Sequence, residues 1–446
     1  MTNKTVIRVP EWSQETISNL SSQQRTQIQE CVERWTVENS LTTPPVSFSG
    51  PKGDILTTSN FVGVVEAAGQ AIEIYPKLDR VLLQDGQALD SDRQKSTMAS
   101  LLWMLEVASH EDIFDADTSS LETSPSNFLD LWAALLGRNL HKELQFGLAR
   151  AYRPVEDNAT TVRGRILFHE QLLHNANRPD RIYCGWDEFT EDRPLNRILK
   201  CACRFLSGYV QNPDTQRLLF DCIAIFEEVE DIDAATALRQ VDRIIWDRSM
   251  QRFKLPFRLA VRLLQSVGHE AFHGGPQTYV FLLDMNQVFE DYVGAILSRE
   301  HQVPVDSQYR IGTLFVAPKR IQQKPDYYWQ DKHGNAFIAD AKYKPFFDWH
   351  QAPQESEFQS GYFNVQDIRQ LICYGLMAPA PPERVHLQLV YPFVGEGPLP
   401  PAITKNTFTR MPLTAVPIRA TRPQLPDEPL IGCHPHFPAV SSSGTF

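Results

Sequence analysis

Two carboxylates and one amine lie close together in the segment from residue 324 to 344, KPDYYWQDKHGNAFIADAKYK. Asp326 follows a proline near its start, and Asp340 and Lys342 stand two residues apart near its end. Carboxylate oxygens are the ligands that Mg²⁺ prefers. A bound divalent cation polarises a phosphate and activates water, and a neighbouring lysine adds positive charge where the phosphate reacts. These residues predict metal-dependent phosphodiester cleavage with Mg²⁺, or with Mn²⁺ in its place.

A β-hairpin is needed to bring these three groups together. Two aromatic and apolar runs flank the polar turn DKHGN, in which Gly334 and Asn335 suit left-handed backbone angles. Side chains two residues apart on a strand leave the same face, so Asp340 and Lys342 point together and Asp326 reaches them across the ladder. By itself, a D-x-K pair is more often a solvated strand with a surface ion pair. The upstream proline–aspartate, the glycine turn and the flanking helices favour the catalytic interpretation.

The flanking helices supply further polar side chains. Glu290 precedes the hairpin on one helix and is a candidate metal ligand, or alternatively a solvated glutamate beside Asp291. On the later helix, Gln370 and Tyr374 are four residues apart and share a face. They either contact a phosphate or water, or hydrogen-bond each other. The predicted catalytic set is Asp326, Asp340, Lys342, Glu290, Gln370 and Tyr374, with Asp326, Asp340 and Glu290 as metal ligands.

The pattern of apolar residues predicts a mixed α/β chain with several domains. We expect strands within residues 45–78, helices over 95–108 and 126–150, and mixed structure over 151–190. Two longer helical regions follow, at 194–229 and 233–264, and then a loop at 269–277. The rest is expected to contain a helix at 280–300, strands at 309–316, 326–330 and 336–343, a helix at 364–378, and a strand at 385–393, followed by a proline-rich tail.

A chain of 446 residues is too long for one compact core. We expect a β-rich and helical region at 1–150, a mixed linker and helical region at 151–275, and a domain with a central mixed sheet flanked by helices at 276–420. A proline-rich tail at 421–446 with a disordered end completes the prediction.

Charge and composition limit the function classes. The net charge of −11 argues against a free-standing DNA binder, because phosphate contacts need Lys and Arg. Residues 251–350, with twelve Lys and Arg against ten Asp and Glu, are less acidic than the rest. A subunit whose grip on DNA comes partly from a partner fits this distribution. The sequence has neither a long apolar run nor a signal-peptide pattern, so we expect a cytoplasmic protein without a membrane span.

Several other classes of site have little support in the sequence. The seven cysteines are scattered and are expected to be reduced structural thiols. The C-H-P-H run at 433–436 contains metal-ligand types but is better explained as a loop. No P-loop is present, so the chain is not expected to be an NTPase itself. No serine-hydrolase elbow or zinc-binding pattern occurs either.

With these residues identified, the chain resembles the McrC family, the nuclease subunits of modification-dependent McrBC restriction systems. The resemblance runs over about residues 50–395, and the order and spacing of its elements are distinctive. These elements are FVGVVEAAGQAIEIYPKL (61–78), LLWML (101–105), GLARAY (147–152), VRGRI (162–166), EDRPLNRILK (191–200), DMNQVFEDYVGAIL (284–297), the KPD and DAKYK motifs, DIRQLICYGLM (367–377) and LQLVYPF (387–393).

The resemblance implies a PD-(D/E)xK restriction-endonuclease-like domain, in which Asp326, Asp340 and Lys342 match the motif and Glu290 falls near the position of a helical acid. It also implies that the N-terminal region docks into a hexameric AAA+ GTPase, McrB, and stimulates GTP hydrolysis. The substrate would be double-stranded, modified DNA, cut in antiviral defence. Residues 210–249 match the family pattern poorly. Two alternatives stay open: a non-catalytic adaptor that activates the motor, and a stand-alone nuclease.

Overall fold

The chain divides into two compact units that do not follow the order of the sequence. Unit 1 comprises residues 1–116 and 282–446, and unit 2 comprises residues 117–281. The N-terminal and C-terminal regions, which the sequence suggested as separate domains, therefore belong to one unit. The computed structural model describes residues 5–67, 69–77, 99–101, 103–105, 107–108, 128–266, 279–301, 305–313, 322–344, 364–394, 398–421, 423 and 428–432.

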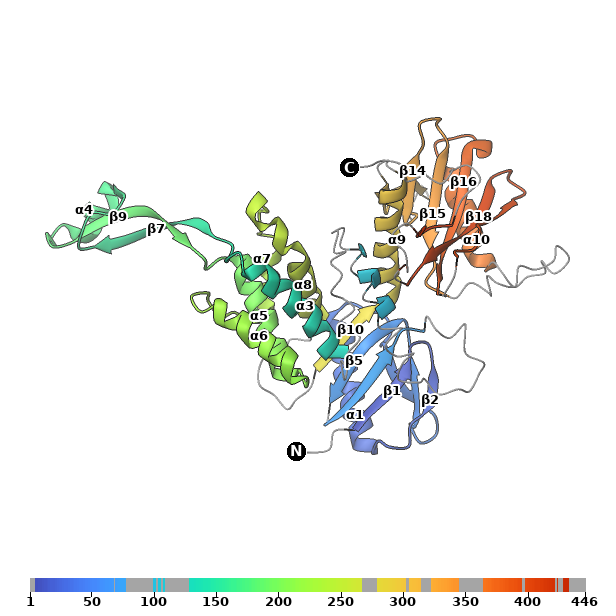
Figure 1. Cartoon of the computed structure of the whole chain (residues 1–446), viewed down its shortest axis with the longest axis horizontal. Coiled ribbons are helices and arrows are strands. Elements are labelled where there is room, and N and C mark those ends of the chain that lie inside the picture. The colour runs from blue at the N-terminus through green and yellow to red at the C-terminus, as the bar shows by residue number, and fades with distance from the viewer. Residues whose placement is uncertain are drawn as a thin grey trace. The chain divides into compact units, whose positions relative to one another are not determined.

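The N-terminal part of unit 1 is built on two small sheets (Figure 1). A helix, α1 (Ser22–Glu38), begins with a capping box between Ser21 and Gln24 and packs Trp35 edge-on against Phe61 at 5.7 Å. The β structure predicted over residues 45–78 is confirmed. One sheet has the order β1 (Thr5–Pro10), β6 (Gln70–Tyr75), β5 (Phe61–Ala67), β10 (Tyr279–Asp284), and the other has β2 (Gln14–Thr16), β4 (Ile55–Thr58), β3 (Val46–Ser49).

A six-stranded mixed sheet forms the C-terminal part of unit 1, as the sequence predicted. Its central pairs, β15–β16 and β16–β18, are parallel, whereas β14–β15 and β17–β18 are antiparallel. The helices α9 (Met285–His301) and α10 (Val365–Met377) pack against it. The strand order is β11 (Asp306–Ser307), β14 (Tyr327–Gln330), β15 (Ala336–Ala341), β16 (Val385–Phe393), β18 (Pro412–Arg419), β17 (Ile403–Asn406).

The core between this sheet and α10 follows from strand alternation. Ile338 on β15 and Leu387 on β16 point to the same side and meet Leu371 and Tyr374 of α10. All four side chains are buried. The helix therefore covers the face of the sheet toward which every second residue of β15 points. Short elements complete the region: β12 (Gly312–Thr313), β13 (Gln322–Gln323) and a 3-10 turn at Pro382–Arg384.

The structure differs from the sequence predictions at three places in this region. Residues 280–284, expected as the first turn of a helix, are a strand, and α9 begins only at Met285. The run YVFLLD is apolar throughout, and such short runs do not distinguish a buried strand from a helix. The sequence beyond residue 393 also adds β17 and β18, and β18 lies between β16 and β17. Of the strand expected at 309–316, only Gly312–Thr313 pairs within the described residues, and 314–316 lie outside them.

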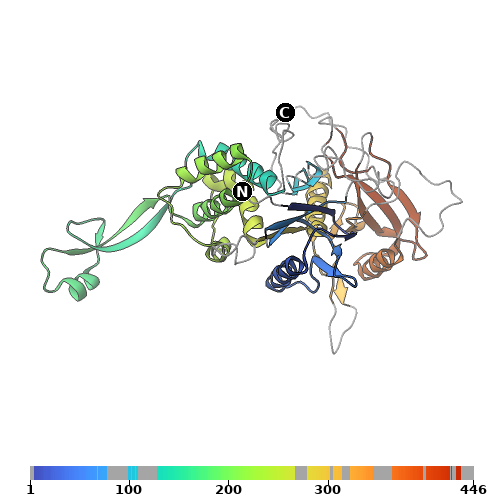
Figure 2. The ribbon, with the colours of Figure 1, turned by 90° about the horizontal axis from the view of Figure 1, so that it is seen from below.

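Unit 2 consists of a helical bundle and a long β arm (Figures 1 and 2). The helices predicted from the sequence are confirmed, although the single helical regions at 194–229 and 233–264 each divide into shorter helices. The helices of the bundle are α3 (Phe128–Leu144), α5 (Pro194–Tyr209), α6 (Pro213–Ile225), α7 (Ala234–Val241), a 3-10 segment at Arg248–Phe253, and α8 (Lys254–Ser266). Within the described residues, no helix is long and apolar enough to cross a membrane.

The arm, residues 151–190, is a three-stranded ribbon with one short helix. Strands β7 (Ala151–Ala159) and β9 (Ile182–Thr190) pair antiparallel over their whole length. The short strand β8 (Arg165–Ile166) adds to β9, and α4 (Phe168–Asn175) lies between them in the sequence. The sequence had indicated only mixed structure for this segment.

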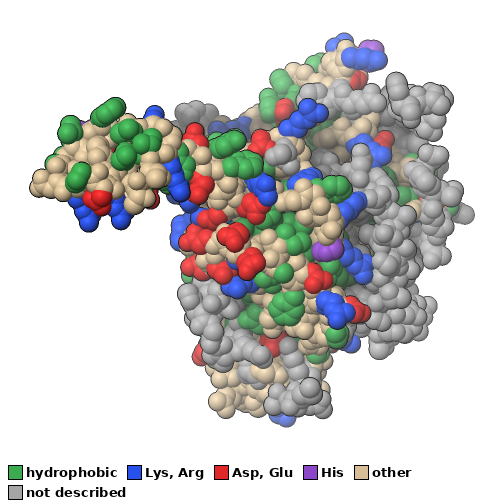
Figure 3. Space-filling model, turned by 60° about the vertical axis from the view of Figure 1, so that its left-hand side comes forward, with side chains coloured by type: hydrophobic (Ala, Val, Ile, Leu, Met, Phe, Trp, Pro, Cys, Tyr) green, Lys and Arg blue, Asp and Glu red, His purple; other side chains and the backbone are tan. Residues whose placement is uncertain are grey.

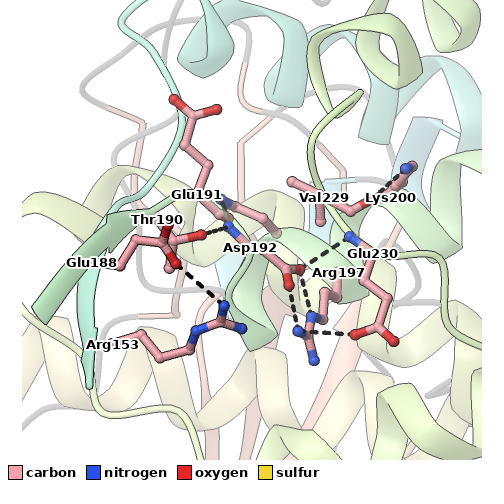
Figure 4. Close-up of polar contacts among 10 residues, drawn as sticks. Arg153, Glu188, Thr190, Glu191, Asp192, Arg197, Lys200, Val229 and Glu230 are labelled. Atoms are coloured by element: carbon pink, nitrogen blue, oxygen red, sulfur yellow. Dashed lines mark hydrogen bonds and ion pairs between the residues drawn. The ribbon is translucent and has the colours of Figure 1, made fainter. Parts of the chain in front are cut away.

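An ion-pair network fixes the base of the arm to the bundle (Figure 4). Two residues after the end of β9, the Asp192 carboxylate accepts hydrogen bonds of 2.6 and 2.5 Å from the guanidinium of Arg197 on α5. Arg197 also pairs with Glu230 at 2.9 Å, and the Glu230 N–H donates to Asp192. Hydrogen bonding from Arg197 lowers the pKa of Asp192. Because bidentate arginine–carboxylate pairs are geometrically specific, the network fixes the direction in which the arm leaves the bundle.

Gly294 of α9 allows a close approach that orders the helix against the sheet. A Cβ atom at this position would lie 2.9 Å from Cε1 of Tyr327 on β14. We expect Gly294→Ala to lower the free energy of unfolding by about 1 to 3 kcal/mol, although alanine is the better helix former. Denaturant titration measures this.

Gly208 of α5 is the matched control, because a Cβ atom there would meet no atom within 4 Å. Gly208→Ala should leave stability unchanged or raise it by up to about 1 kcal/mol. Equal effects of the two substitutions would show that the close contact with Tyr327 is not important for folding.

Candidate active site

The hairpin that carries the candidate residues forms as the sequence predicted. Strands β14 and β15 pair antiparallel, with Tyr327 opposite Ala339 and Gln330 opposite Ala336. Gly334 in the turn has φ 79°, whereas Asn335 does not have a positive φ. The Asp331 carboxylate closes the turn by accepting the backbone N–H groups of His333 and Asn335.

The two acids of the hairpin meet at the end where β15 finishes. Asp326, directly before β14, accepts the N–H of Ala341 with Oδ2 at 2.8 Å. Asp340 is the fifth residue of β15 and is only 2% exposed. Asp326 precedes Tyr328 by two residues and Asp340 follows Ile338 by two, so both acids belong to the sheet face that packs against α10. The predicted convergence of the two carboxyl groups is present in the structure.

Lys342 completes the group just beyond the end of β15. Its backbone N–H donates to the carbonyl of Val390 at 2.8 Å, which extends the parallel pairing with β16 by one residue. Its ammonium forms an ion pair with Oδ2 of Asp340. Burial favours the neutral amine, but the Asp340 carboxylate outweighs it and raises the pKa of Lys342. The lysine is therefore charged and held beside the two acids.

Burial and the neighbouring charges perturb the titration of Asp326. Burial, together with the nearby charges of Asp340 and Glu290, raises the pKa of Asp326 to about 8. The ammonium of Lys342 contacts the buried Oδ2 of Asp340. Two buried carboxyl groups beside a single ammonium offer hard oxygens that suit a divalent cation. The side chains at this end of β15 therefore fit a magnesium site.

Glu290 lies near this group but does not form a three-acid cluster with it. Its Oε1 accepts the amide of Gln308 at 2.8 Å, and its backbone carbonyl accepts the hydroxyl of Tyr327. Burial raises the pKa of Glu290. Within the described parts of the chain, no three His, Cys, Asp or Glu side chains are grouped as metal ligands. The structure brings together two of the three ligands predicted from the sequence.

Gln370 and Tyr374 share one face of α10, as predicted, and they bond to each other. The Gln370 amide donates to the Tyr374 hydroxyl at 2.8 Å, which is the alternative to phosphate binding that the sequence left open. Burial, and also the carboxylates of Asp340 and Asp326, raises the pKa of Tyr374. Tyr374 therefore lies close enough to the acids for their charge to affect its pKa.

The structure adds polar residues to this region that sequence reasoning missed. Lys344 forms an ion pair with Asp367 at the start of α10. The K-x-K spacing in DAKYK was a signal for Lys344, since residues 342 and 344 stand two apart like 340 and 342. Tyr343 donates a hydrogen bond of 2.8 Å to Glu11, which is 332 residues away in the sequence. No local pattern indicates that contact.

The other candidates from the sequence carry no site in the described residues. The six cysteines among those residues are free, and all except Cys373 are buried. Burial raises the pKa of Cys201 to about 12, as expected for an unreactive structural thiol. The C-H-P-H run at 433–436 and the loop at 269–277 lie outside the described residues.

The structure resembles solved McrBC complexes. It matches a chain of the refined half-complex from the tetradecameric assembly of Thermococcus gammatolerans McrB AAA+ hexamers with bound McrC, with 18% identity, a TM-score of 0.63, and coverage of 93% of this chain and 95% of that one. It also matches a chain of the Thermococcus gammatolerans McrBC complex, with 19% identity, a TM-score of 0.50, and coverage of 66% and 88% respectively. At these identities the likeness concerns the fold.

The sequence comparisons identify the family. No curated protein matched the sequence significantly. A family model described as the McrBC 5-methylcytosine restriction system component matches residues 56–392, which include the hairpin and both flanking helices. This match covers well over half of the 446 residues. The chain therefore belongs to the McrBC 5-methylcytosine restriction system component family.

Proposed function

We propose that this chain is the nuclease subunit of an McrBC-type restriction system and hydrolyses phosphodiester bonds of double-stranded DNA. The observation that carries the proposal is the convergence of Asp326, Asp340 and Lys342 at one end of the β14–β15 hairpin. We assign the mixed sheet with α9 and α10 to the PD-(D/E)xK class. Its hairpin provides the first acid before one strand and the D-x-K pair at the end of the next.

Each residue of the site has a distinct role in this proposal. Asp326 and Asp340 would hold Mg²⁺ through their carboxylate oxygens, with Mn²⁺ as a substitute. A cation held there would supply Lewis-acid chemistry, lowering the pKa of water and polarising the scissile phosphate. Lys342 places its ammonium beside the reacting phosphate and balances charge that develops there. The charge of Glu290 helps to raise the pKa of Asp326. Tyr374, hydrogen-bonded to Gln370, lies near the acids on α10.

We further propose that the protein acts with a hexameric AAA+ GTPase. One of the solved structures that it resembles contains McrC bound to McrB AAA+ hexamers. The family description names 5-methylcytosine, so modified DNA is the proposed substrate. An acidic chain binds DNA weakly by itself, and the net charge of −11 fits a subunit that receives DNA from a motor. A defence role against foreign DNA follows from this system.

The arm is the surface that we propose for docking to the GTPase. Its helix α4 exposes three large apolar side chains, Phe168, Leu172 and Leu173, at 74%, 73% and 63%. Hydrophobic side chains are also visible over the surface of the arm in Figure 3. Several large apolar residues exposed on one short helix are typical of a protein-interaction surface. The arm is thus our proposed docking surface, and docking through residues 1–150 stays a prediction from the sequence.

Substitution of Asp340 tests the nuclease assignment. We expect Asp340→Asn to lower DNA cleavage by at least about a thousandfold, because the metal loses an anionic ligand and Lys342 loses its partner. Cleavage of methylated DNA with the GTPase, GTP and Mg²⁺ measures this, and GTP hydrolysis serves as the folding control. Wild-type cleavage by the variant would refute the site. Absence of cleavage by the wild-type protein would support the adaptor alternative.

Substitution on α4 tests the docking surface. We expect Phe168→Ser with Leu172→Ser and Leu173→Ser to weaken binding of the GTPase by at least about tenfold, because the exposed apolar anchors are removed. Binding is measured by titration, and the stimulation of GTP hydrolysis should fall with it. Phe408→Ser, at a phenylalanine outside the arm that is 88% exposed, is the control and should bind normally. Normal binding by the triple variant would exclude α4.

The raised pKa of Asp326 predicts how stability depends on pH. The folded-state pKa is about 8 and the ordinary value is 3.8, so the folded chain keeps a proton that the unfolded chain releases. This contribution to stability is complete below pH 3.8 and is lost as the pH rises toward about 8. With a chelator present, Asp326→Asn should therefore gain in melting temperature relative to the wild type as the pH rises.

Added Mg²⁺ should stabilise the wild-type protein more at about pH 8 than at about pH 5, because ionised carboxylates bind the cation. Differential scanning fluorimetry at a series of pH values measures both effects. Glu11, with a pKa raised to about 7, contributes in the same direction and should remain in the variant. A difference between variant and wild type that does not change with pH would contradict the assignment for Asp326.

A further inference from the structure

A buried glutamate far from the hairpin in sequence contacts the segment that carries Lys342. Glu11 directly follows β1, at the end of the first small sheet, and its side chain is fully buried. Its Oε1 accepts two hydrogen bonds of 2.8 Å, from the backbone N–H of Lys77 and from the hydroxyl of Tyr343. Within the described residues, its Oε2 receives no hydrogen bond. A buried carboxyl group with an incomplete set of donors is costly, which argues that it has a specific role.

Tyr343 is held on several sides. Its ring lies 5.8 Å from that of Phe289 on α9, and the ammonium of Lys77 lies 5.0 Å from its centre. The same ammonium lies 5.2 Å from the centre of the Trp12 ring, so one cation bridges two aromatic rings. Trp12 has φ 54°, a left-handed conformation that is unfavourable for a bulky residue. The turn after β1 is thus strained in the conformation that places Glu11 and Trp12 around Lys77 and Tyr343.

The backbone pairing between β15 and β16 ends at Lys342, so Tyr343 lies just beyond the paired strand. The last backbone bond from β15 to β16 is that of the Lys342 N–H to Val390, and the Lys344 N–H then turns back to the Lys342 carbonyl at 2.8 Å. The side chains of the two neighbours diverge: Lys342 reaches Asp340, and Tyr343 reaches Glu11. The hydroxyl of Tyr343 therefore anchors the chain at the first position beyond the paired strand.

We propose that Glu11 and Tyr343 are positioning residues that hold the Lys342 ammonium in register with Asp326 and Asp340. This inference rests on the proposed nuclease function. It makes the N-terminal sheet part of the catalytic apparatus, since the acceptor for Tyr343 comes from the turn after β1. The contribution is indirect, because neither residue touches the acids or the lysine side chain in the contacts described above.

Burial raises the pKa of Glu11 to about 7, against the opposing effects of Lys77 and Tyr343. Asp284, which precedes α9, also disfavours the charge on Glu11. The hydrogen bond from Tyr343 can form with either protonation state, because a protonated carboxyl keeps an acceptor oxygen. The anchor therefore depends on the presence of the two groups and does not need a particular charge.

Substitutions of these two residues in the full chain, assayed with its GTPase, GTP, Mg²⁺ and methylated DNA, test the proposal. Tyr343→Phe removes the hydroxyl but keeps the ring that packs against Phe289. We expect the cleavage rate at saturating DNA to fall by about tenfold to a hundredfold with KM unchanged, because small misplacements of a catalytic group are costly. Glu11→Ala, which removes the acceptor, should lower the rate by a similar factor.

The double variant provides a readout that general destabilisation would not mimic. If both residues act through one hydrogen bond, Glu11→Ala combined with Tyr343→Phe should cleave no more slowly than the slower single variant. The matched control is Tyr75→Phe, at the end of β6 in the same small sheet, whose buried hydroxyl has no hydrogen-bond partner among the described residues. It should cleave within about twofold of the wild-type rate.

The outcomes separate this proposal from the proposed function. Folded single variants that cleave at the wild-type rate, while Asp340→Asn is inactive, would overturn the positioning role and leave the nuclease intact. Losses that multiply in the double variant would also overturn it. A wild-type protein that never cleaves would instead refute the nuclease function itself. Melting temperatures and GTP hydrolysis of each variant establish that the proteins compared are folded.

Discussion

Two carboxyl groups buried against each other are the constraint on which the candidate site depends. Asp326 and Asp340 repel when both are ionised, and burial removes the water that would screen them. The N–H of Ala341 and the ammonium of Lys342 offset part of this cost. Such a pair persists only where the surrounding structure fixes its position, and a divalent cation would remove the repulsion. The buried pair therefore destabilises the fold, and contacts in the rest of unit 1 must offset this cost.

The support comes from a strand held on both edges and packed by helices. Strand β15 lies between β14 and β16, so its backbone cannot shift to relieve the acids. The core of α10 packs on the face that carries them, and α9 binds the hairpin through the Tyr327 hydroxyl. The close approach at Gly294 keeps that helix near the sheet. Rigid elements of this kind position side chains more precisely than loops do.

Buried polar contacts join the two sequence segments of unit 1. Tyr343 bonds to Glu11, and the Trp103 indole donates to the hydroxyl of Tyr292 on α9. The hydroxyl of Tyr292 in turn donates to the carbonyl of Arg419 at the end of β18. Breaking any of these contacts would leave a buried polar group without its partner, which costs more than the bond itself contributes. The arm and the helical bundle of unit 2 are inserted between the two segments.

The features that depend on local interactions could be predicted from the amino-acid sequence. Strand alternation and a glycine turn define the hairpin and place Asp340 and Lys342 on one face, and most helices follow from their 3.6-residue period. Three features depend on tertiary contacts: residues 280–284 form a strand, β18 enters the sheet beside β16, and Glu290 bonds Gln308 instead of completing a three-acid cluster. The meeting of Glu11 and Tyr343 depends on them as well. These outcomes depend on contacts between segments far apart in the chain, and neither periodicity nor spacing carries information about which distant segment will be the neighbour.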